Sequence, residues 1–525
     1  MKKETKSLVQ EKKERKKNMN KFVAGLNAEH DHVLTENGGK AYRSAGNALM
    51  DLFAHGGAYR QRNEADCILL FQKAYKENPT YALKCLFYLR DILEGQGERR
   101  FFRVCLNWLA KKDTDAVVRN IESIPELGRW DDLYELVDTP AEHAAFDFIK
   151  CQLTLDVQSK TPSLLGKWLK SENASAKRTR YLGMKTRNAL GMNARLYRKT
   201  LSMLRKRINI VERLMSAGQW DLIEFDKIPS QAGFRYRNAF ARRDILKQKY
   251  EKFIKDEKTT VNARAMAPYE VVAQAPRVYR KGLDDVERVA INKYWDNLHD
   301  YFEGCSLNAL CMIDTSGSMT WGGTNNVLPI DVATSLGLYA AEKAQGPFHG
   351  TYISFSSRPQ LIKTDGVDFV DKVRRIRETD LCENTNLAAA FDMLLNVAIK
   401  NRCRQDELPA KIVVITDGEF DSMVYNDRSG DRYDYWNHHR SSALEGWESV
   451  AETITRKWAD YGYKMPELIF WNVNSRNDQV PMKMQHGVSL VSGFSASTFQ
   501  MVMSDKSGVD LMYEVLDRER YANIK

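Results

Sequence analysis

The sequence predicts a multidomain α + α/β chain, in which an all-helical N-terminal half precedes a doubly wound α/β domain. Residues 21–280 repeat apolar side chains at the three- and four-residue spacing of helices and show almost no strand-like alternation. From about residue 305, short apolar runs with polar stops alternate with helical patterns, which is typical of a parallel sheet covered on both faces. A length of 525 residues is sufficient for two large domains or three smaller ones.

The composition is that of a globular protein, with 43% hydrophobic and 28% charged residues. No run of 18 apolar residues marks a membrane span, and the basic start of the chain lacks the apolar segment of a secretory signal. None of the eight cysteines forms a C-x-x-C pair, so we expect reduced, buried thiols rather than disulfides or zinc ligands. These features predict a cytoplasmic protein with no membrane association.

The net charge of +10 is unevenly distributed along the chain. Residues 1–20 sum to +5, and we expect them to form a basic disordered tail that is solvated. Residues 161–280 hold 27 Lys and Arg against 10 Asp and Glu, a net +17, whereas residues 305–525 sum to −6. One strongly basic internal segment indicates a polyanionic partner, most simply a nucleic acid.

The helical half, residues 21–280, divides into many helices of medium length. Apolar residues fall on one stripe in segments 81–93 and 98–112, and Gly95 and Gly97 lie at the break between them. Many such helices with short connections predict a stacked helical array. No repeat period is visible in the sequence itself.

The α/β domain is expected over residues 305–525, and residues 281–304 are expected to form a connecting helix. Four apolar runs predict buried strands at 307–314, 350–356, 411–417 and 467–474. Helical patterns lie between them at 329–344, 386–400 and 443–462. Ligands bind outside the carboxyl ends of the strands in such sheets, so polar residues that follow the strands are candidate site residues.

Two predicted strands end in aspartates that mark a candidate metal site. Asp314, Ser316 and Ser318 lie on one tight loop after the first strand, and Asp417 follows the strand at 411–417. Thr385 lies just before a helix, where its hydroxyl can face the same edge. Carboxylate and hydroxyl oxygens suit Mg²⁺ or Mn²⁺ and are poor ligands for zinc.

This order of motifs resembles the metal-ion-dependent adhesion site of von Willebrand factor A domains. The resemblance implies a ligand set of Asp314, Ser316, Ser318, Thr385 and Asp417. It also implies an open coordination position for an acidic group of a partner. The alternative is a von Willebrand A scaffold whose metal has little role. A long polar insertion at 423–447 either covers the ion or contacts a partner, or is a mobile surface loop.

A dense basic cluster falls within residues 177–207 of the helical half. It comprises Lys177, Arg178, Arg180, Lys185, Arg187, Arg195, Arg198, Lys199, Arg205, Lys206 and Arg207. Tyr181 and Tyr197 are interleaved with these cations, and aromatic side chains can stack on the bases of single strands. The cluster therefore predicts RNA contacts, with a solvated helix face as the alternative.

Motifs of the helical half resemble the TROVE module of the Ro autoantigen, telomerase-associated and vault proteins. They are RD at 90–91, GQGER at 95–99 and GRWDDL at 128–133. The layout is closer still to an uncharacterised family of plants, bacteria and phages with the same two parts. The resemblance implies HEAT-like helical repeats in a ring closed by the von Willebrand A domain. It also implies that structured RNAs bind the basic outer surface and single-stranded ends enter the hole.

Two functions are compatible with these features. The first is a non-enzymatic, Ro-like RNA-binding protein with a Mg²⁺-dependent site for a protein partner. The second is a protein-interaction adaptor or chaperone-like assembly factor that grips an acidic residue through the metal, without RNA. No P-loop, H-E-x-x-H or G-x-S-x-G motif is present, so we expect no enzymatic activity.

Overall fold

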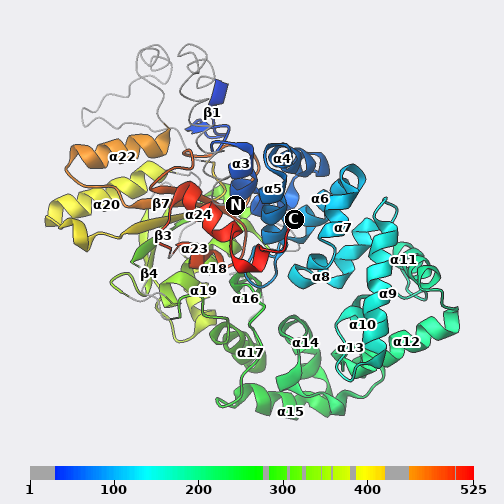
Figure 1. The fold of residues 1–525 in the computed structure, drawn as a ribbon. Coiled ribbons are helices and arrows are strands. Elements are labelled where there is room, and N and C mark those ends of the chain that lie inside the picture. The colour runs from blue at the N-terminus through cyan, green and yellow to red at the C-terminus, as the bar shows by residue number, and fades with distance from the viewer. Residues whose placement is uncertain are drawn as a thin grey trace.

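The computed structural model describes residues 30–275, 283–303, 308–321, 327–343, 346–355, 359–378, 386–419, 449–502 and 504–525. Over these residues, a helical N-terminal region precedes a domain built on a mixed sheet (Figure 1). The predicted α + α/β organisation is therefore confirmed. The basic tail at 1–20, Thr385 and the insertion at 423–447 lie outside the described residues.

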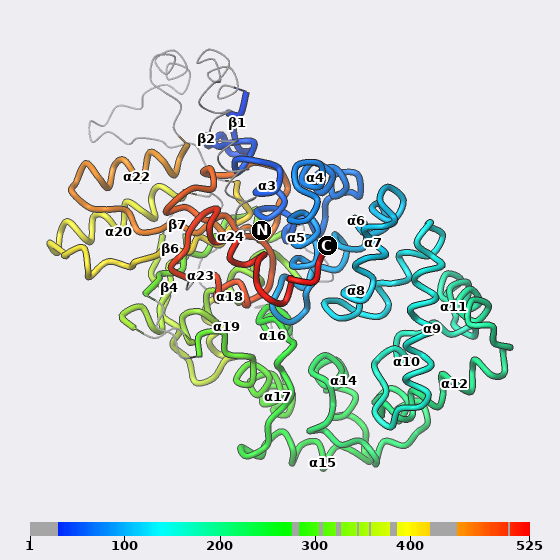
Figure 2. Tube along the Cα trace, viewed as in Figure 1, coloured from blue at the N-terminus to red at the C-terminus, as the bar shows by residue number. Residues whose placement is uncertain are grey.

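The helical region forms an arc that leaves the sheet domain and returns to it (Figures 1 and 2). Its α-helices are α3 (Ala48–His55), α4 (Glu64–Glu77), α5 (Pro79–Arg90), α6 (Arg99–Lys112), α7 (Thr114–Arg119), α8 (Ser123–Leu127), α9 (Glu142–Gln158), α10 (Leu165–Trp168), α11 (Lys177–Ala189), α12 (Ala194–Arg207), α13 (Val211–Ser216), α14 (Ser230–Arg242), α15 (Asp244–Lys255), α16 (Pro268–Val272) and α17 (Asp285–Asp296). Short 3₁₀ segments connect some of them, namely η1 (Gly56–Gln61), η2 (Trp130–Leu136), η3 (Trp220–Leu222) and η4 (Phe225–Lys227).

Polar caps determine where many of these helices begin. The side chains of Asn63, Asn78 and Asn193 each accept a hydrogen bond from a backbone N–H in the first turn of α4, α5 and α12. Glu98 does the same for α6, because its carboxylate accepts from Arg100 N at 2.9 Å and Phe101 N at 3.2 Å. Gly97, with φ of 61°, supplies the left-handed turn before this cap.

A small hairpin at the start of the helical region was not predicted from the sequence. Its strands β1 (His32–Leu34) and β2 (Lys40–Tyr42) pair antiparallel. Three-residue strands are too short to show an alternating pattern. Tyr42 also forms a bridge with Val480, so the hairpin is tied to the sheet domain.

The second part of the chain is a six-stranded sheet of order β5-β4-β3-β6-β7-β8. Its strands are β3 (Ala309–Asp314), β4 (Thr351–Phe355), β5 (Gln360–Lys363), β6 (Lys411–Thr416), β7 (Glu467–Asn472) and β8 (Val488–Ser492). All neighbours are parallel except the edge strand β5, which is antiparallel to β4. The chain winds outward from β3 in one direction and from β6 in the other. The switch point of the sheet therefore lies between β3 and β6, where doubly wound folds bind ligands.

Helices and short 3₁₀ segments accompany the sheet. They are η5 (Gly317–Thr320), α18 (Pro329–Lys343), α19 (Phe369–Glu378), α20 (Leu387–Asn401), η6 (Gln405–Glu407), α22 (Val450–Asp460), α23 (Thr498–Val502), α24 (Gly508–Leu516) and η7 (Glu519–Tyr521). The predicted runs at 307–314, 350–356, 411–417 and 467–474 coincide with β3, β4, β6 and β7. Strands β5 and β8 were not predicted from the sequence. The central strands β3 and β6 are buried almost throughout, as parallel strands covered on two faces should be.

Both ends of the helical arc contact the sheet domain (Figure 2). At the first end, Gly57 N donates to Ser492 Oγ of β8 at 3.0 Å. A side chain at Gly57 would collide with β8, since its Cβ would lie 2.7 Å from the Ser492 carbonyl oxygen. At the second end, Arg377 of α19 donates to the carbonyl oxygens of Val272 and Ala275 at 3.0 and 2.7 Å. The sheet domain thus fixes the start and the end of the arc.

Candidate functional site

The last residue of β3 and the loop after this strand bring three polar side chains together at the switch point. Asp314 is fully buried, and its Oδ1 accepts a hydrogen bond from Ser316 N at 2.9 Å. The hydroxyl oxygens of Ser316 and Ser318 are 3.0 Å apart. Thr416, at the end of β6, donates its hydroxyl to Asp314 Oδ2 at 2.7 Å. A carboxylate and two serine hydroxyls are therefore close together at the edge where ligands bind.

Asp417 brings a second carboxylate to the same place from the end of β6. Its side chain is 2% exposed, and its Oδ1 accepts from Glu419 N at 3.3 Å. Gly418 between them has φ of 87°, a conformation that glycine adopts without strain. The Ser318 hydroxyl acts on Asp417 from the loop after β3 and opposes the rise that burial causes in the pKa of its carboxyl group. The loop after β3 and the loop after β6 therefore form one site.

The two carboxylates are held where negative charge is unfavourable. Burial, and secondarily the negative charge of Asp417, raises the pKa of Asp314 to about 7. Burial also raises the pKa of Asp417, against the opposing effect of Arg476. Among the described residues Asp314 has no basic partner. The site is short of positive charge, which a divalent cation would supply.

Arg476, which was not predicted as a site residue, is the cation that contacts Asp417. Its Nη2 donates to Asp417 Oδ2 at 3.1 Å, and its Nη1 lies 3.2 Å from Glu36 Oε2. Its guanidinium also covers the ring of Trp321, 4.8 Å from the ring centre. Its position in the sequence could have indicated this role, because Arg476 follows the carboxyl end of β7, where residues are candidates for the site.

The hairpin loop of the helical region reaches this site through Glu419, which is 1% exposed. Glu36 N donates to Glu419 Oε2 at 2.9 Å, and Asn37 Nδ2 donates to the Glu419 carbonyl oxygen at 2.8 Å. Asn477 and Gln479 donate to the same carboxylate at 2.9 and 2.8 Å. The loop after β6 and the N-terminal hairpin are therefore joined by one polar network, which is buried at Glu419 and exposed at Glu36.

The donor set fits a hard divalent ion. Asp314, Ser316, Ser318 and Asp417 lie together, whereas Thr385 is outside the described residues. The described part of the chain contains no group of three or more His, Cys, Asp or Glu side chains suited to a metal. An ion at this site would therefore depend on the serine hydroxyls as well as on the carboxylates. Such all-oxygen sets are typical of Mg²⁺ and Mn²⁺.

The predicted basic cluster is divided between α11 and α12, and most cations of α11 have local partners. Arg178 is 3.2 Å from Asp138, Lys185 is 2.8 Å from Glu142, and Arg187 is 2.8 Å from Glu172. Arg180 donates to the backbone carbonyl oxygens of residues 174 and 175. Lys177 is exposed at the start of the helix. Much of the positive charge of α11 is therefore neutralised or engaged within the fold.

Two arginines at the end of α12 hold backbone carbonyls of the preceding segments. Arg205 donates to the Gly166 and Leu169 carbonyl oxygens at 3.0 and 2.8 Å, where α10 ends. Arg207 donates to the Val157 carbonyl oxygen at the end of α9 at 2.7 Å. Both guanidinium groups therefore connect helices, a role that the sequence alone did not reveal.

The remaining cations of α12 form an exposed stripe. The stripe consists of Arg195, Arg198, Lys199 and Lys206. The last three lie three, four and eleven residues after Arg195, a spacing that places all four on one face of the helix. Among the described residues, no acidic side chain pairs with any of them. Tyr197 and Leu201 lie on the opposite, buried face. The expectation that Tyr197 stacks on bases is therefore wrong, since its ring is fully buried and its hydroxyl donates to the Lys170 carbonyl oxygen at 2.8 Å.

No helix in the described residues has the length and apolar character needed to cross a membrane.

Comparisons with known proteins give matches over both parts of the chain. A curated relative, "Uncharacterized protein L728" of Acanthamoeba polyphaga mimivirus, is 29% identical over 514 residues and covers 90% of this chain and 84% of its own length. A solved structure, "Crystal structure of Deinococcus radiodurans RO (RSR) protein", has a TM-score of 0.41 and 14% identity, and covers 90% of this chain and 99% of that one. One family model, "Domain of unknown function (DUF7788)", matches residues 308–523. A second, "Domain of unknown function (DUF2828)", matches residues 35–181 and 162–303, more than half of the chain, and the chain therefore belongs to this family.

Proposed function

We propose that this protein binds RNA through the exposed cationic stripe of α12. The observation that carries the proposal is the two-faced character of this helix. One face packs Tyr197, Leu201 and Leu204 into the core, and the other presents four cations that no described acidic side chain neutralises. Neither α11 nor α12 contains an Asp or Glu. Clustered, unpaired Lys and Arg on one surface is the arrangement that phosphate contacts require.

The position of α12 in the arc supports the proposal. α12 lies far from the sheet domain, on the part of the arc that extends away from it (Figure 1). A long polyanion could therefore reach the stripe without meeting the net-negative sheet domain, whose residues 305–525 sum to −6. The motifs at 90–91, 95–99 and 128–133 resemble the TROVE module, which implies the same class of partner and a ring closed by a von Willebrand A domain.

The proposal includes a Mg²⁺- or Mn²⁺-dependent site for a protein partner. Asp314, Ser316, Ser318 and Asp417 would hold the ion, and Thr385 matches the same motif in the sequence. A partner carboxylate would complete the coordination, because the site has oxygen donors but few full charges. Both proposed activities are binding activities, and neither requires a catalytic residue.

An adaptor without an RNA role is the second candidate function. The observation that favours it is the polar network from buried Asp417 through Arg476 and the exposed Glu36 to the hairpin. This network would let a partner bound at the metal act on the helical region. RNA binding separates the two candidates, since the adaptor requires none.

Fluorescence anisotropy with a labelled RNA tests the first proposal. The variant replaces all four stripe cations with glutamine: Arg195→Gln, Arg198→Gln, Lys199→Gln and Lys206→Gln. A matched control removes four exposed lysines elsewhere: Lys76→Gln, Lys111→Gln, Lys112→Gln and Lys400→Gln. We expect the first variant to bind at least about tenfold more weakly. Its log–log salt slope should shrink by about 0.7 to 0.9 for each lost phosphate contact.

The control should bind RNA almost as the wild type does, although it has lost the same charge. Equal weakening of both variants would mean that only the net charge matters, which would contradict a specific surface on α12. Wild-type protein that binds no RNA at low salt would favour the adaptor instead.

A further inference from the structure

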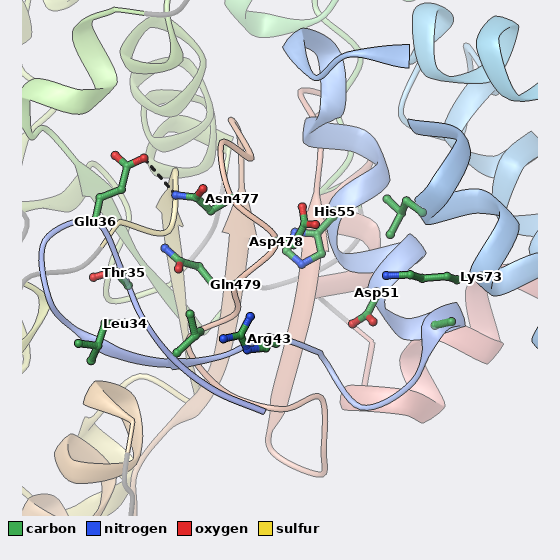
Figure 3. A pocket seen from close by; sticks show the side chains of 13 residues that line it. Leu34, Thr35, Glu36, Arg43, Asp51, His55, Lys73, Asn477, Asp478 and Gln479 are labelled. Carbon is green, nitrogen blue, oxygen red and sulfur yellow. Dashed lines mark hydrogen bonds between the residues drawn. The ribbon is translucent and has the colours of Figure 1, made fainter. Parts of the chain in front are cut away.

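A cavity of about 550 Å³ lies between the N-terminal hairpin, α3, α4 and the loop after β7. Figure 3 shows Arg43, Asp51, His55 and Lys73 around it, with Asp478 beside His55. Nothing in the proposed RNA or metal sites uses this space. Its volume is in the range of small-molecule sites, about 300 to 1,000 Å³.

The acidic side chains of the loops around the cavity already have cationic partners. Glu36 lies 3.2 Å from Arg476, and Asp478 lies 3.1 Å from Arg62. Tyr59 also donates its hydroxyl to Asp478. Each of these cations also pairs with a second carboxylate, Arg476 with Asp417 and Arg62 with Asp66, so their compensation of Glu36 and Asp478 is partial.

The basic side chains of the cavity are less engaged, although the charge of Lys73 acts on Asp51 and opposes the rise that burial causes in its pKa. Within the described residues, neither Arg43 nor Lys73 forms an ion pair, and both are exposed at the cavity. Lys73 points toward Asp51 on the facing wall (Figure 3). Asp51 is fixed there by hydrogen bonds from Ala45 N at 2.6 Å and Ser44 Oγ at 3.0 Å. The cavity therefore presents two cations and one fixed carboxylate.

His55 adds a buried acceptor without a partner. Its ring is 2% exposed, and burial lowers its pKa to about 4, so the ring is neutral near pH 7. Ser475 donates its only hydroxyl proton to the Asn477 carbonyl oxygen at 2.8 Å, so its oxygen must accept from His55 Nδ1 at 3.2 Å. Nε2 is then an acceptor, and it has no hydrogen-bond partner among the described residues. Nε2 is itself closed to solvent, so His55 contributes a neutral ring to the cavity wall and not a contact for a ligand atom.

We propose that the cavity binds a small zwitterion, an amino acid or a related compound with an anionic group and an amine. Arg43 and Lys73 would hold the carboxylate or phosphate of the ligand. The amine would donate to the Asp51 carboxylate, which the hydrogen bonds from Ala45 and Ser44 hold in place. Val33, Leu34 and Leu70 line the cavity and would contact its hydrocarbon part. The described lining residues include no Phe, Tyr or Trp, so a stacked nucleobase is disfavoured.

Titration calorimetry on the full chain tests this proposal. The probes are the twenty standard amino acids and phosphoethanolamine, screened first by thermal shift, with inorganic phosphate and methylamine as single-charge controls. We expect at least one zwitterion to bind with a Kd below 1 mM, as is common for metabolite sites, and phosphate and methylamine to bind at least about tenfold more weakly. The variant Arg43→Gln/Lys73→Gln should lose at least tenfold in affinity. Lys76→Gln, on the same helix as Lys73 but outside the cavity, should retain it.

Three results would overturn the proposal. One is that no zwitterion in the panel binds. Another is that phosphate alone binds as tightly as the best zwitterion, which would make the cavity a simple anion site. The third is that Arg43→Gln/Lys73→Gln binds as the wild type does. RNA affinity should not change in any of these variants, so failure here is separate from failure of the RNA proposal.

Discussion

The guanidinium of Arg60 lies 3.9 Å from the centre of the Phe494 ring. Arg60 belongs to η1 at the start of the helical arc, whereas Phe494 follows β8 in the sheet domain. Tyr269, in α16 near the end of the arc, packs edge-on against the same ring, with the centroids 5.2 Å apart. One aromatic ring of the sheet domain therefore joins the two ends of the arc.

Replacing Arg60 with methionine should destabilise the whole chain. Glu98, which is 2% exposed and lies 2.7 Å from Arg60 Nε, would be left as a buried carboxylate without its cation. Breaking one side of such a pair costs about 3 kcal/mol. Urea unfolding followed by circular dichroism measures this loss. A change of less than about 1 kcal/mol would show that the junction does not support the arc.

Metal binding should depend on the hydroxyls as well as on Asp314. We expect Asp314→Ala to abolish Mg²⁺ and Mn²⁺ binding in calorimetry. Ser316→Ala should weaken it by at least about tenfold, since even outer-shell partners contribute that much. Thr320→Ala is the control, because Thr320 lies on the same loop but its hydroxyl donates to the Gly317 carbonyl oxygen. Equal binding by wild type and Asp314→Ala would rule out the assignment.

Stability of the metal-free protein should fall as the pH rises from about 4 to about 7. The pKa of Asp314 is raised by burial from its usual value near 4 to about 7, so the folded state holds a proton that the unfolded state releases. Rising pH across this range therefore stabilises the unfolded state relative to the folded state, until the folded state also loses the proton near pH 7. Thermal unfolding in EDTA measures this slope, and Asp314→Asn should reduce it. An identical slope in the variant would assign the effect to other groups.

Substitutions of Arg205 and Arg198, which both belong to α12, should have opposite effects on stability and on RNA affinity. Arg205→Gln should lower stability by about 1.5 to 3 kcal/mol, since charged hydrogen bonds to the Gly166 and Leu169 carbonyl oxygens are lost. RNA affinity of the folded variant should change little. Arg198→Gln should weaken RNA binding and leave the unfolding midpoint unchanged, because Arg198 is exposed and, among the described residues, bonds only to its own helix. The opposite result would contradict the conclusion that Arg205 holds helices together whereas Arg198 contacts RNA.

The parts of the site that could be predicted from the sequence are the residues whose place in the fold follows from their position directly at the end of a strand. Aspartates directly after buried strands meet at the sheet edge, so Asp314 and Asp417 could be found from the sequence. Arg476 and Glu419 could not be assigned a role, since their partner Glu36 is about 380 to 440 residues away and no local pattern reports such contacts.

The distribution of charge along the sequence also predicts only part of the candidate RNA surface. The sequence shows that residues 177–207 are rich in cations, but it does not show which of them are used inside the fold. Arg198 and Arg205 are on one helix seven residues apart. One faces solvent, and the other binds the end of α10, because Arg205 is close to carbonyl groups that need donors. That distinction depends on how α10 and α12 pack.

The central claim is that RNA contacts the exposed stripe of α12. Ultraviolet crosslinking of the full chain to a labelled RNA, followed by mass spectrometry of the crosslinked peptides, tests it most directly. We expect the crosslinks to be concentrated in peptides from residues 194–207 and to disappear when the four stripe cations are replaced with glutamine. Crosslinks confined to other parts of the chain, or unchanged in that variant, would contradict the account.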